Sequence, residues 1–288
     1  METLIDFWNT KYRPNRLRSA SPNTLALWGI SLRHFDRFLQ RHATLSDLNN
    51  ETLDAFATWR REQVAAATLN KDLASLLALW RFAHRLNLLT EWPLTQLEPE
   101  PQRIPFAWTE AELSAILQAA RRLPGTIGNH QAADWWAALL LVCFDTAERI
   151  GAVRQLTWDR VDLHRRWIMF KAETRKGSRA DSAVRIHHDT ATSLARIRHS
   201  RGPVFPWPFV PNSIWSHYGK LLEAAGLPSD RRHKFHAIRR TTASHLEAAG
   251  GNATAALRHS SRAITQAYLD PRIAPPPQAV DLLFRPKT

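Results

Sequence analysis

The segment EWPLTQLEPEPQRIP, residues 91–105, is the feature that most limits how this 288-residue chain can fold. It contains four prolines and no apolar periodicity, which is typical of an extended connection between domains. We therefore expect a first domain over residues 1–91, a linker over 92–107, a second domain over 108–270 and a tail over 271–288.

The first domain is predicted to be all-helical. Apolar residues recur at spacings of three and four from Leu25 to Leu39 and from Leu69 to Ala83, and a shorter helix is expected over Thr52–Gln63. The basic residues that fall largely off these stripes are Arg33, Arg37, Arg41, Lys71, Arg81 and Arg85. They either form solvated helix faces or contact DNA, and the sequence leaves both interpretations open.

The second domain is predicted to begin with a helix. Thr109-Glu-Ala-Glu112 has the pattern of a capping box, and Trp108 and Leu113 have the spacing of a hydrophobic staple. The run Ala132–Phe144 is apolar on nearly all sides, as in a buried central helix.

The rest of the second domain is predicted to add a small β element to this helical framework. A helix is expected over Arg149–Leu156, and Arg166–Lys171 and Ser182–His187 predict two short strands around a polar turn. Residues 189–269 are expected to be mostly helical. The predicted fold class is mainly α with a small β-hairpin or sheet in the second domain.

The charge of the chain indicates a polyanionic partner. Its formal net charge is +13, with 12 basic and 9 acidic residues before Trp92 and 27 basic and 17 acidic residues from Trp92 onward. The longest apolar stretch, Trp135–Phe144, is about half of the roughly 20 residues that a membrane span needs. The single cysteine, Cys143, cannot form an internal disulfide. We therefore expect a protein of the reducing cytoplasm, without export signal or membrane anchor.

Two short patterns in the second domain could act on a phosphodiester. His236 and Arg239 lie three residues apart, so on a helix both side chains could reach one phosphate. His259 precedes Tyr268 by nine residues. Each pattern alone is weak, because such pairs are more often surface or packing residues. The histidines at positions 187, 188, 233, 236 and 245 have neither paired cysteines nor a His-Glu-x-x-His arrangement, so we expect no metal site.

Taken in order, four segments resemble the tyrosine recombinase family of phage integrases and Xer-type recombinases. The family box TGLRISELLxLxWxDID matches residues 145–162, with Arg149 at the catalytic arginine. The box HxLRHTxAxxLxxxG matches residues 236–250, with His236 and Arg239 in place. The box LGHxSxxTTxxY matches residues 257–268, with His259 and Tyr268 at the family spacing.

The remaining catalytic group of the family is a lysine in a β-hairpin turn. Lys176 in Arg175-Lys-Gly-Ser-Arg179 fits this position best, and Lys171 is the alternative. Two positions depart from the family pattern. Ala152 stands where an acidic residue commonly follows the first arginine, and Arg258 replaces the glycine before the histidine.

The resemblance implies a site-specific recombinase with a helical core-binding, SAM-like first domain and a catalytic second domain. It implies that Tyr268 forms a 3′-phosphotyrosyl bond without metal or ATP, that Arg149 and Arg239 bind the phosphate, and that Lys176 protonates the leaving oxygen. His236 and His259 would share the remaining proton and phosphate contacts. A type IB topoisomerase and a non-catalytic DNA-binding accessory protein are the alternatives.

The expected partner is double-stranded DNA, bound by a homotetramer on two duplexes. The residues expected at the DNA are Arg33, Arg37, Asn70, Lys71, Arg81, Arg175, Arg179 and Arg240. The tail carries an apolar patch at Val280, Leu282, Leu283 and Phe284, which would either pass to a neighbouring protomer or fold back on its own domain.

Overall fold

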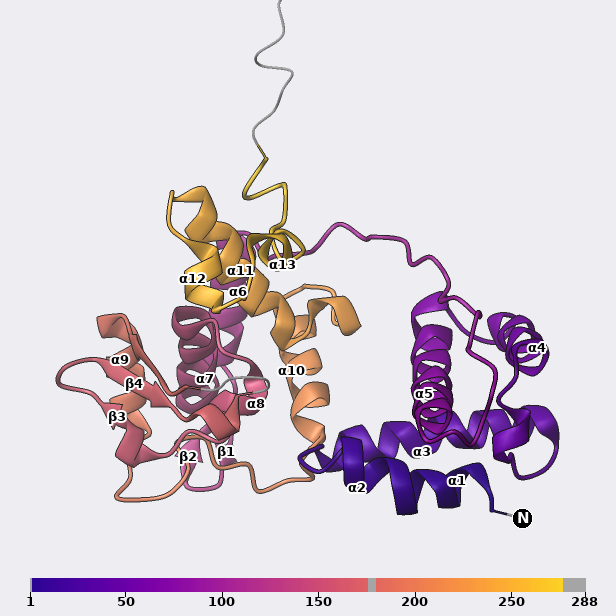
Figure 1. Cartoon of the computed structure of the whole chain (residues 1–288). Helices are drawn as coiled ribbons and strands as arrows, with labels where there is room; N and C mark the ends of the chain where they lie inside the picture. Colours follow the sequence, from indigo (N-terminus) through magenta and orange to yellow (C-terminus); the bar gives the residue numbers. More distant parts are fainter. Residues whose placement is uncertain (1, 176–179, 277–288) are drawn as a thin grey trace, which may run out of the picture. The chain divides into compact units, whose positions relative to one another are not determined.

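The computed structural model describes residues 2–175 and 180–276, and the chain divides into two compact units, Met1–Gln102 and Arg103–Thr288 (Figure 1). The first unit is helical. Its α-helices are α1 (Leu4–Phe7), α2 (Arg13–Arg16), α3 (Pro22–Leu39), α4 (Asn50–Arg61) and α5 (Ala66–Arg85), with a π-helical turn at Trp8–Tyr12 and a 3-10 turn at Leu45–Asp47.

The apolar stripes of α3, α4 and α5 form the core of the first unit. Phe35, Phe56 and Trp80 are fully buried there. The core also holds one polar junction, because the buried Asp72 accepts hydrogen bonds from Ser31 Oγ (2.7 Å) and Arg60 Nε (3.0 Å). These bonds tie α3, α4 and α5 together and satisfy a carboxylate that would be costly to bury alone.

The proline-dotted segment runs along the first unit before it leaves it. Trp80 Nε1 donates to the carbonyl of Glu91 (2.8 Å), and the Asn70 amide pairs with both the N–H and the carbonyl of Glu98 (2.8 Å each). The side chain of Arg61 pairs with that of Glu98. These contacts explain why the first compact unit includes the linker as far as Gln102, so that the division between the units falls inside the linker expected over residues 92–107.

The second unit combines helices with two small antiparallel sheets. Its helices are α6 (Glu110–Arg121), α7 (Ala132–Thr146), α8 (Ile150–Val153), α9 (His188–Arg196), α10 (Ser213–Ala224), α11 (Phe235–Ala248), α12 (Ala253–Leu257) and α13 (Arg262–Gln266). Its strands are β1 (Thr126–Ile127), β2 (His130–Gln131), β3 (Val161–Asp162), β4 (Trp167–Phe170) and β5 (Ser182–Arg185). Three 3-10 turns lie at Trp158–Arg160, Ala172–Thr174 and Arg231–His233.

Helix α7 is the centre of the second unit, as its uniform apolar character predicts. It packs against α6, α9 and α11, and the sheet of order β3-β4-β5 lies on its flank (Figure 1). Trp135 and Leu139 of α7 are fully buried. The expected capping box forms, since Thr109 Oγ1 accepts from the N–H of Glu112 and the Glu112 carboxylate accepts from the N–H of Thr109.

The predicted fold class is confirmed. The two predicted strands pair antiparallel as β4 and β5, from Trp167 opposite Arg185 to Phe170 opposite Ser182. The helix expected over Arg149–Leu156 is shorter than predicted, because α8 makes a single turn around Gly151, a residue of low helix propensity, and then continues in tighter turns. In the parts of the chain that the structure describes, no helix is both long and apolar enough to cross a membrane.

Candidate active site

The loop after α7 presents two side chains of opposite charge in different directions. Ala147 ends the helix with a left-handed backbone (φ 50°). Glu148 is buried, with 3% of its surface exposed, whereas Arg149 is exposed and provides the N-cap residue of α8. The loop therefore places one arginine at the surface directly beside a buried acid.

Helix α11 supplies a histidine and an arginine on one face. His236 lies in the first turn of this helix, and Arg239 lies one turn later. Arg239 is buried, with 2% of its surface exposed. Arg239 Nη1 donates to the carbonyl of Ala147, and Nη2 donates to the carbonyl of Leu257 (2.9 Å). Within the described residues its Nε has no hydrogen-bond partner. A buried guanidinium donor without a partner is suited to an anion that enters the site.

The turn between α12 and α13 carries the second histidine. His259 Nε2 lies 3.3 Å from Arg239 Nη2, and its Nδ1 lies 3.2 Å from Thr265 Oγ1. Because a guanidinium only donates hydrogen bonds, Nε2 acts as the acceptor and the proton of the neutral ring is on Nδ1, which donates to Thr265. The ring of His259 is thereby held in a fixed orientation.

Tyr268 follows α13 and brings its ring against all three groups. Its ring centroid lies 5.1 Å from that of His236 and 4.6 Å from that of His259, and Arg239 Cζ lies 5.8 Å from it. The tyrosine is half-buried and packs on the small apolar cluster that includes Leu257. Two glycines let the chain turn back from α11 towards α12: Gly250 has a φ of 80°, and a Cβ on Gly251 would meet the side chain of Leu246.

The concentration of cations shifts the pKa values of the site. The pKa of His236 is lowered to about 4 by desolvation and by the nearby charges of Arg240, Arg239 and Arg149, although the residue as a whole is exposed. Desolvation and Arg149 also lower the pKa of Arg239 to about 10, while Glu148 and the Tyr268 phenol act in the opposite direction. The pKa of His259 is lowered by desolvation, Arg239 and Arg149. Both histidines are therefore neutral at pH 7.

A cavity of about 410 Å³ opens beside these groups. Its lining residues are Glu148, Arg149, Ile150, Trp215, Arg231, Lys234, Phe235, His236 and Arg239. Arg231 and Lys234 are cationic residues that the sequence reasoning missed. The available signal was the basic run Arg231-Arg232-His233-Lys234, which ends two residues before His236.

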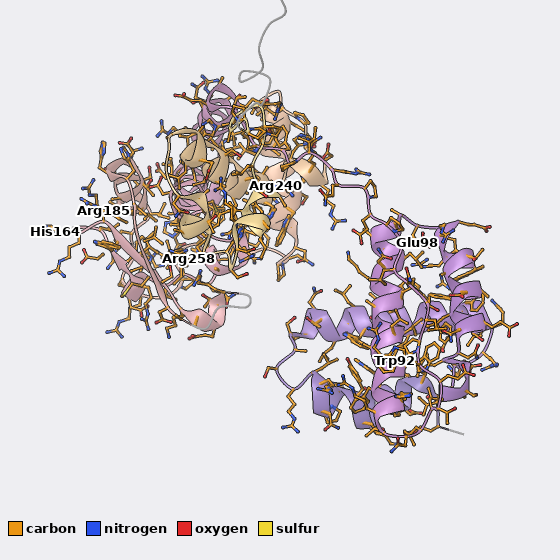
Figure 2. All side chains as sticks on the ribbon, turned by 45° about the horizontal axis from the view of Figure 1, so that its top comes forward. Trp92, Glu98, His164, Arg185, Arg240 and Arg258 are labelled. Carbon is orange, nitrogen blue, oxygen red and sulfur yellow. The ribbon has the colours of Figure 1, made fainter. Side chains whose placement is uncertain are left out.

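The residues expected at DNA fall into different environments. Arg33, Arg37, Lys71 and Arg81 are exposed on α3 and α5. Asn70 is buried and its amide holds the linker, and the Arg175 side chain is 8% exposed and bonds to Glu148 (2.7 Å). Arg240 is half-buried next to His236, and Figure 2 marks it on the second unit together with Arg258.

The candidate lysines differ in what the structure says about them. Lys176 and Arg179 lie outside the described residues. Lys171, the alternative, is described, and its Nζ lies 3.7 Å from Glu173 Oε1 at the surface.

Within the described residues, His187, His188 and Asp189 bring three possible metal ligand atoms within 4.8 Å of one another. These three residues are exposed at the start of α9, and such groups are common without an ion.

Comparison with known proteins places both units in one family. The model of the phage integrase family matches residues 107–273, and that of the phage integrase N-terminal SAM-like domain matches residues 15–87. Tyrosine recombinase XerD of Shewanella oneidensis is 24% identical over 283 residues, covering 92% of this chain and 89% of the relative.

Solved structures share the fold at low sequence identity. A lambda integrase fragment, in a dimer bound to a core site, is 17% identical with a TM-score of 0.72, covering 94% of this chain and 96% of that chain. The Tn1549 transposon integrase, in complex with transposon right-end DNA, is 16% identical with a TM-score of 0.74, covering 93% of this chain and 94% of that chain. Because the match to the integrase family model covers more than half of the sequence, including the segments of Arg149, His236, Arg239 and Tyr268, this chain belongs to the phage integrase family.

Proposed function

We propose that this protein is a site-specific DNA recombinase that cuts and rejoins duplex DNA through a 3′-phosphotyrosyl bond at Tyr268. The observation that carries the proposal is the convergence of Tyr268 with His236, His259 and Arg239, at ring distances of 5.1 and 4.6 Å and a cation distance of 5.8 Å. This group adjoins the cationic cavity and includes a guanidinium with an unpartnered Nε.

The reaction proceeds by in-line displacement at phosphorus. The Tyr268 oxygen forms a bond to phosphorus while the bond from phosphorus to the 5′-oxygen breaks. The tyrosine proton passes to neutral His236, whose lowered pKa of about 4 keeps an acceptor nitrogen available at pH 7. Arg149 and Arg239 stabilise the negative charge that builds on the non-bridging oxygens.

The departing 5′-oxygen needs a proton of its own. We assign this step to Lys176, because the resemblance to the family puts a lysine in this turn and an ammonium can donate a proton where a guanidinium holds its proton too tightly. His259 contributes a phosphate contact when the phosphate takes the place of Arg239 Nη2 at Nε2: the ring proton then lies on Nε2, and Nδ1 accepts from Thr265 Oγ1. A free 5′-hydroxyl then attacks the phosphotyrosyl bond, the tyrosine leaves, and the DNA is rejoined without an outside energy source.

DNA is the partner, and we propose that four copies act on two duplexes. A solved lambda integrase, 17% identical with a TM-score of 0.71 over 93% of this chain and 78% of that chain, is a tetramer bound to a Holliday junction. The related structures with DNA support the partner, and the tetramer of this chain rests on analogy.

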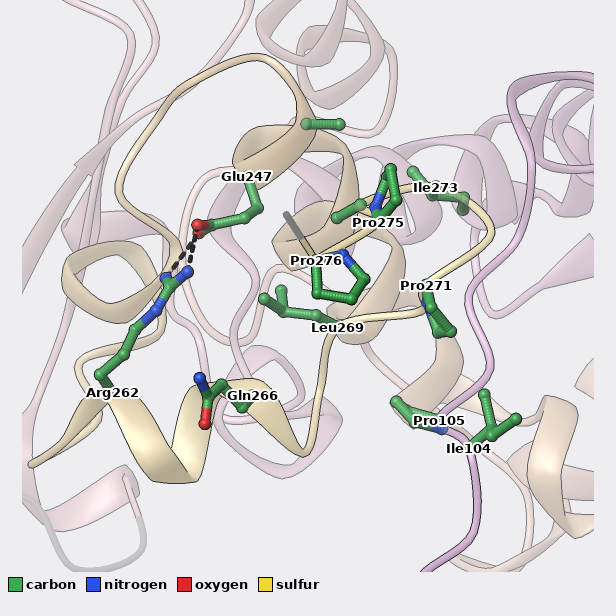
Figure 3. Close-up of a pocket in the computed structure, with 12 residues that line it drawn as sticks. Ile104, Pro105, Glu247, Arg262, Gln266, Leu269, Pro271, Ile273, Pro275 and Pro276 are labelled. Carbon is green, nitrogen blue, oxygen red and sulfur yellow. Dashed lines mark hydrogen bonds and ion pairs between the residues drawn. The ribbon is translucent and has the colours of Figure 1, made fainter. Parts of the chain in front are cut away.

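A pocket beside the end of the described chain supports exchange of the tail between protomers. Its volume is about 750 Å³, and Figure 3 shows apolar residues such as Leu269, Ile273 and Pro276 along it, with the ion pair between Glu247 and Arg262 at one side. The tail beyond residue 276 carries Val280, Leu282, Leu283 and Phe284. We propose that these apolar side chains fill the same pocket of a neighbouring copy.

The first prediction tests the covalent step. Incubating the protein with a nicked suicide duplex that carries its site should give a protein–DNA adduct on a denaturing gel, because the nicked fragment diffuses away and prevents rejoining. Tyr268→Phe should give no adduct while it still binds the duplex. A wild-type protein that forms none, or a variant that forms as much as the wild type, would overturn the mechanism.

The second prediction tests the role of the tail. A chain cut after residue 276 should cleave poorly alone, and full-length Tyr268→Phe should not cleave at all. Mixing the two should restore cleavage, because the inactive variant donates its tail to the truncated chain that keeps Tyr268. A mixture that stays inactive would show that the tail acts within its own chain.

A further inference from the structure

A buried acid joins three segments of the second unit. The Glu148 side chain is 1% exposed, and its Oε1 accepts from Arg175 Nε (2.7 Å) and from Arg258 Nη1 (2.9 Å). The two arginine side chains are 8% and 29% exposed, so little water competes for these bonds. A carboxylate at this depth needs such compensation, because an unpaired buried charge is strongly unfavourable.

Each of the three residues directly precedes a proposed reactive group in the sequence. Glu148 comes before Arg149, Arg258 before His259, and Arg175 before Lys176. The contacts span 27 and 110 positions of the chain, so they connect segments that meet only in the folded protein. The backbones of Arg149 and His259 are therefore attached to the same carboxylate through their neighbours, and Arg175 attaches the end of the described hairpin segment to it.

Arg258 occupies a backbone conformation that favours glycine. Its φ of 54° and ψ of 43° are left-handed, which costs roughly 1–2 kcal/mol for a residue with a Cβ. The family boxes have Leu and Gly at the two positions that Glu148 and Arg258 occupy here. In this conformation Arg258 Nη1 donates to Glu148 Oε1 (2.9 Å).

A second set of bonds joins two of these segments through their backbones. Arg239 donates to the carbonyl of Ala147, next to Glu148, and to the carbonyl of Leu257, next to Arg258. The loop of Arg149 and the turn of His259 are thus joined both through Arg239 and through the Glu148–Arg258 pair. Arg175 is a link from this assembly to the hairpin segment, because its Nε donates to Glu148 Oε1 and its Nη1 donates to the carbonyl of Ala180 (3.3 Å).

We propose that Glu148 is a positioning residue for protonation of the leaving 5′-oxygen: by holding Arg175, it fixes the segment that precedes Lys176 against the loops of Arg149 and His259. The inference rests on the proposed recombinase function. Glu148 supplies the supporting acid that Ala152 cannot, from the position before Arg149 and not from three residues after it.

The test uses a substrate whose leaving group needs no acid. In a duplex with sulfur in place of the bridging 5′-oxygen, the 5′ end of the cut strand leaves as a thiolate. A thiolate is far less basic than an alkoxide and needs no acid to leave. In single-turnover experiments at saturating protein, Glu148→Gln should lower the cleavage rate of ordinary DNA by about tenfold to a hundredfold. The same variant should lower the cleavage rate of the sulfur-containing DNA by less than about threefold.

Two further variants keep the result interpretable. Arg175→Gln removes the other side of the contact and should show the same dependence on the substrate, which covers the case in which Glu148→Gln does not fold. Asp134→Asn breaks a different acid–arginine pair, with Arg196, at the opposite end of α7, and should leave both rates unchanged.

The outcomes separate this inference from the proposed function. If the wild-type protein forms no phosphotyrosyl adduct, the recombinase function itself fails. If the wild type cleaves and both Glu148→Gln and Arg175→Gln slow the two substrates equally, or slow neither, Glu148 does not position the leaving-group acid and only this inference is overturned.

Discussion

In the proposed mechanism, the protonation state of His236 determines whether it can accept the proton of Tyr268. Its pKa is lowered from 6.5 to about 4 by desolvation and by Arg240, Arg239 and Arg149. We predict that the ring signals of His236 in nuclear magnetic resonance spectra of the DNA-free protein titrate near this value, with His236→Asn identifying the signals. A midpoint at or above 6.5 would contradict the prediction.

The same shift makes stability depend on pH with a defined sign. Between about pH 4 and 6.5 the unfolded chain binds a proton that folded His236 refuses, so the free energy of unfolding falls as the pH is lowered through this window. Above about pH 6.5 His236 is neutral in both the folded and the unfolded chain, so it no longer changes the free energy of unfolding with pH. Urea unfolding at two pH values should therefore show a larger loss on acidification for the wild type than for His236→Asn.

At the scale of elements, the segment after Tyr268 is attached to the segment that opens the second unit. The fully buried Asp270 accepts from the N–H of Ala107 (2.8 Å) and from Arg272 Nη2 (2.7 Å), and Arg272 donates to the carbonyl of Ala107 (3.0 Å). Desolvation alone would raise the pKa of Asp270. The hydrogen bonds from the Arg272 side chain and from the backbone N–H groups of Ala107 and Arg272 outweigh desolvation and lower the pKa.

We predict that Asp270→Ala destabilises the second unit by about 2–3 kcal/mol, because it leaves the buried N–H of Ala107 without an acceptor and Arg272 without its partner. Urea unfolding followed by a signal from each unit would measure the change. Glu173→Ala, at an exposed acid of the same unit whose carboxylate lies 3.7 Å from Lys171 Nζ, is the matched control and should change stability by less than about 0.5 kcal/mol. Equal effects of the two substitutions would show that the attachment contributes nothing.

The sequence predicted those elements whose own residues carry the signal. The stripes of α3 and α5, the apolar α7 and the capping box before α6 are local patterns, and each forms as expected. The hairpin of β1 and β2 was missed because strands of two residues carry no periodicity. The N-terminal helical segment was missed although Leu4, Phe7 and Trp8 have helical spacing, since a π-helical turn and Pro14 interrupt the pattern.

The sequence predicted the candidate residues that the structure brings together at Tyr268, but not the contacts that support them. The boxes around Arg149, His236, His259 and Tyr268 have recognisable spacing within short segments. The bonds of Glu148 depend on residues 27 and 110 positions away, and no local pattern encodes such a pairing. The buried position of Asn70 was unexpected for the same reason, because its partners Glu98 and Glu100 belong to the linker.

For the whole molecule, net charge is an incomplete guide to DNA contacts. The part from Trp92 onward carries 27 basic residues, but Arg175, Arg258, Arg262 and Arg272 of this part are engaged in ion pairs with acids of the same unit. In the first unit, Arg33 and Arg37 are exposed one turn apart on α3. These two cations are therefore better candidates for phosphate contacts than the charge totals of the two parts suggest.

We predict that replacing Arg33 and Arg37 by alanine weakens DNA binding and makes it less sensitive to salt. Each phosphate contact releases condensed counterions, so the slope of log affinity against log salt should decrease by about 2 in magnitude when both contacts are lost. Fluorescence anisotropy with a labelled duplex over a salt series measures this slope.

Arg121→Ala with Arg122→Ala removes the same charge from an exposed helix end, that of α6, and serves as the control. If α3 lies on the DNA, the control pair should change the slope by less than about 0.5, because long-range effects of surface charge are screened at these salt concentrations. If the two pairs change the slope equally, Arg33 and Arg37 act only through net charge, and the basic face of α3 is a solvated surface.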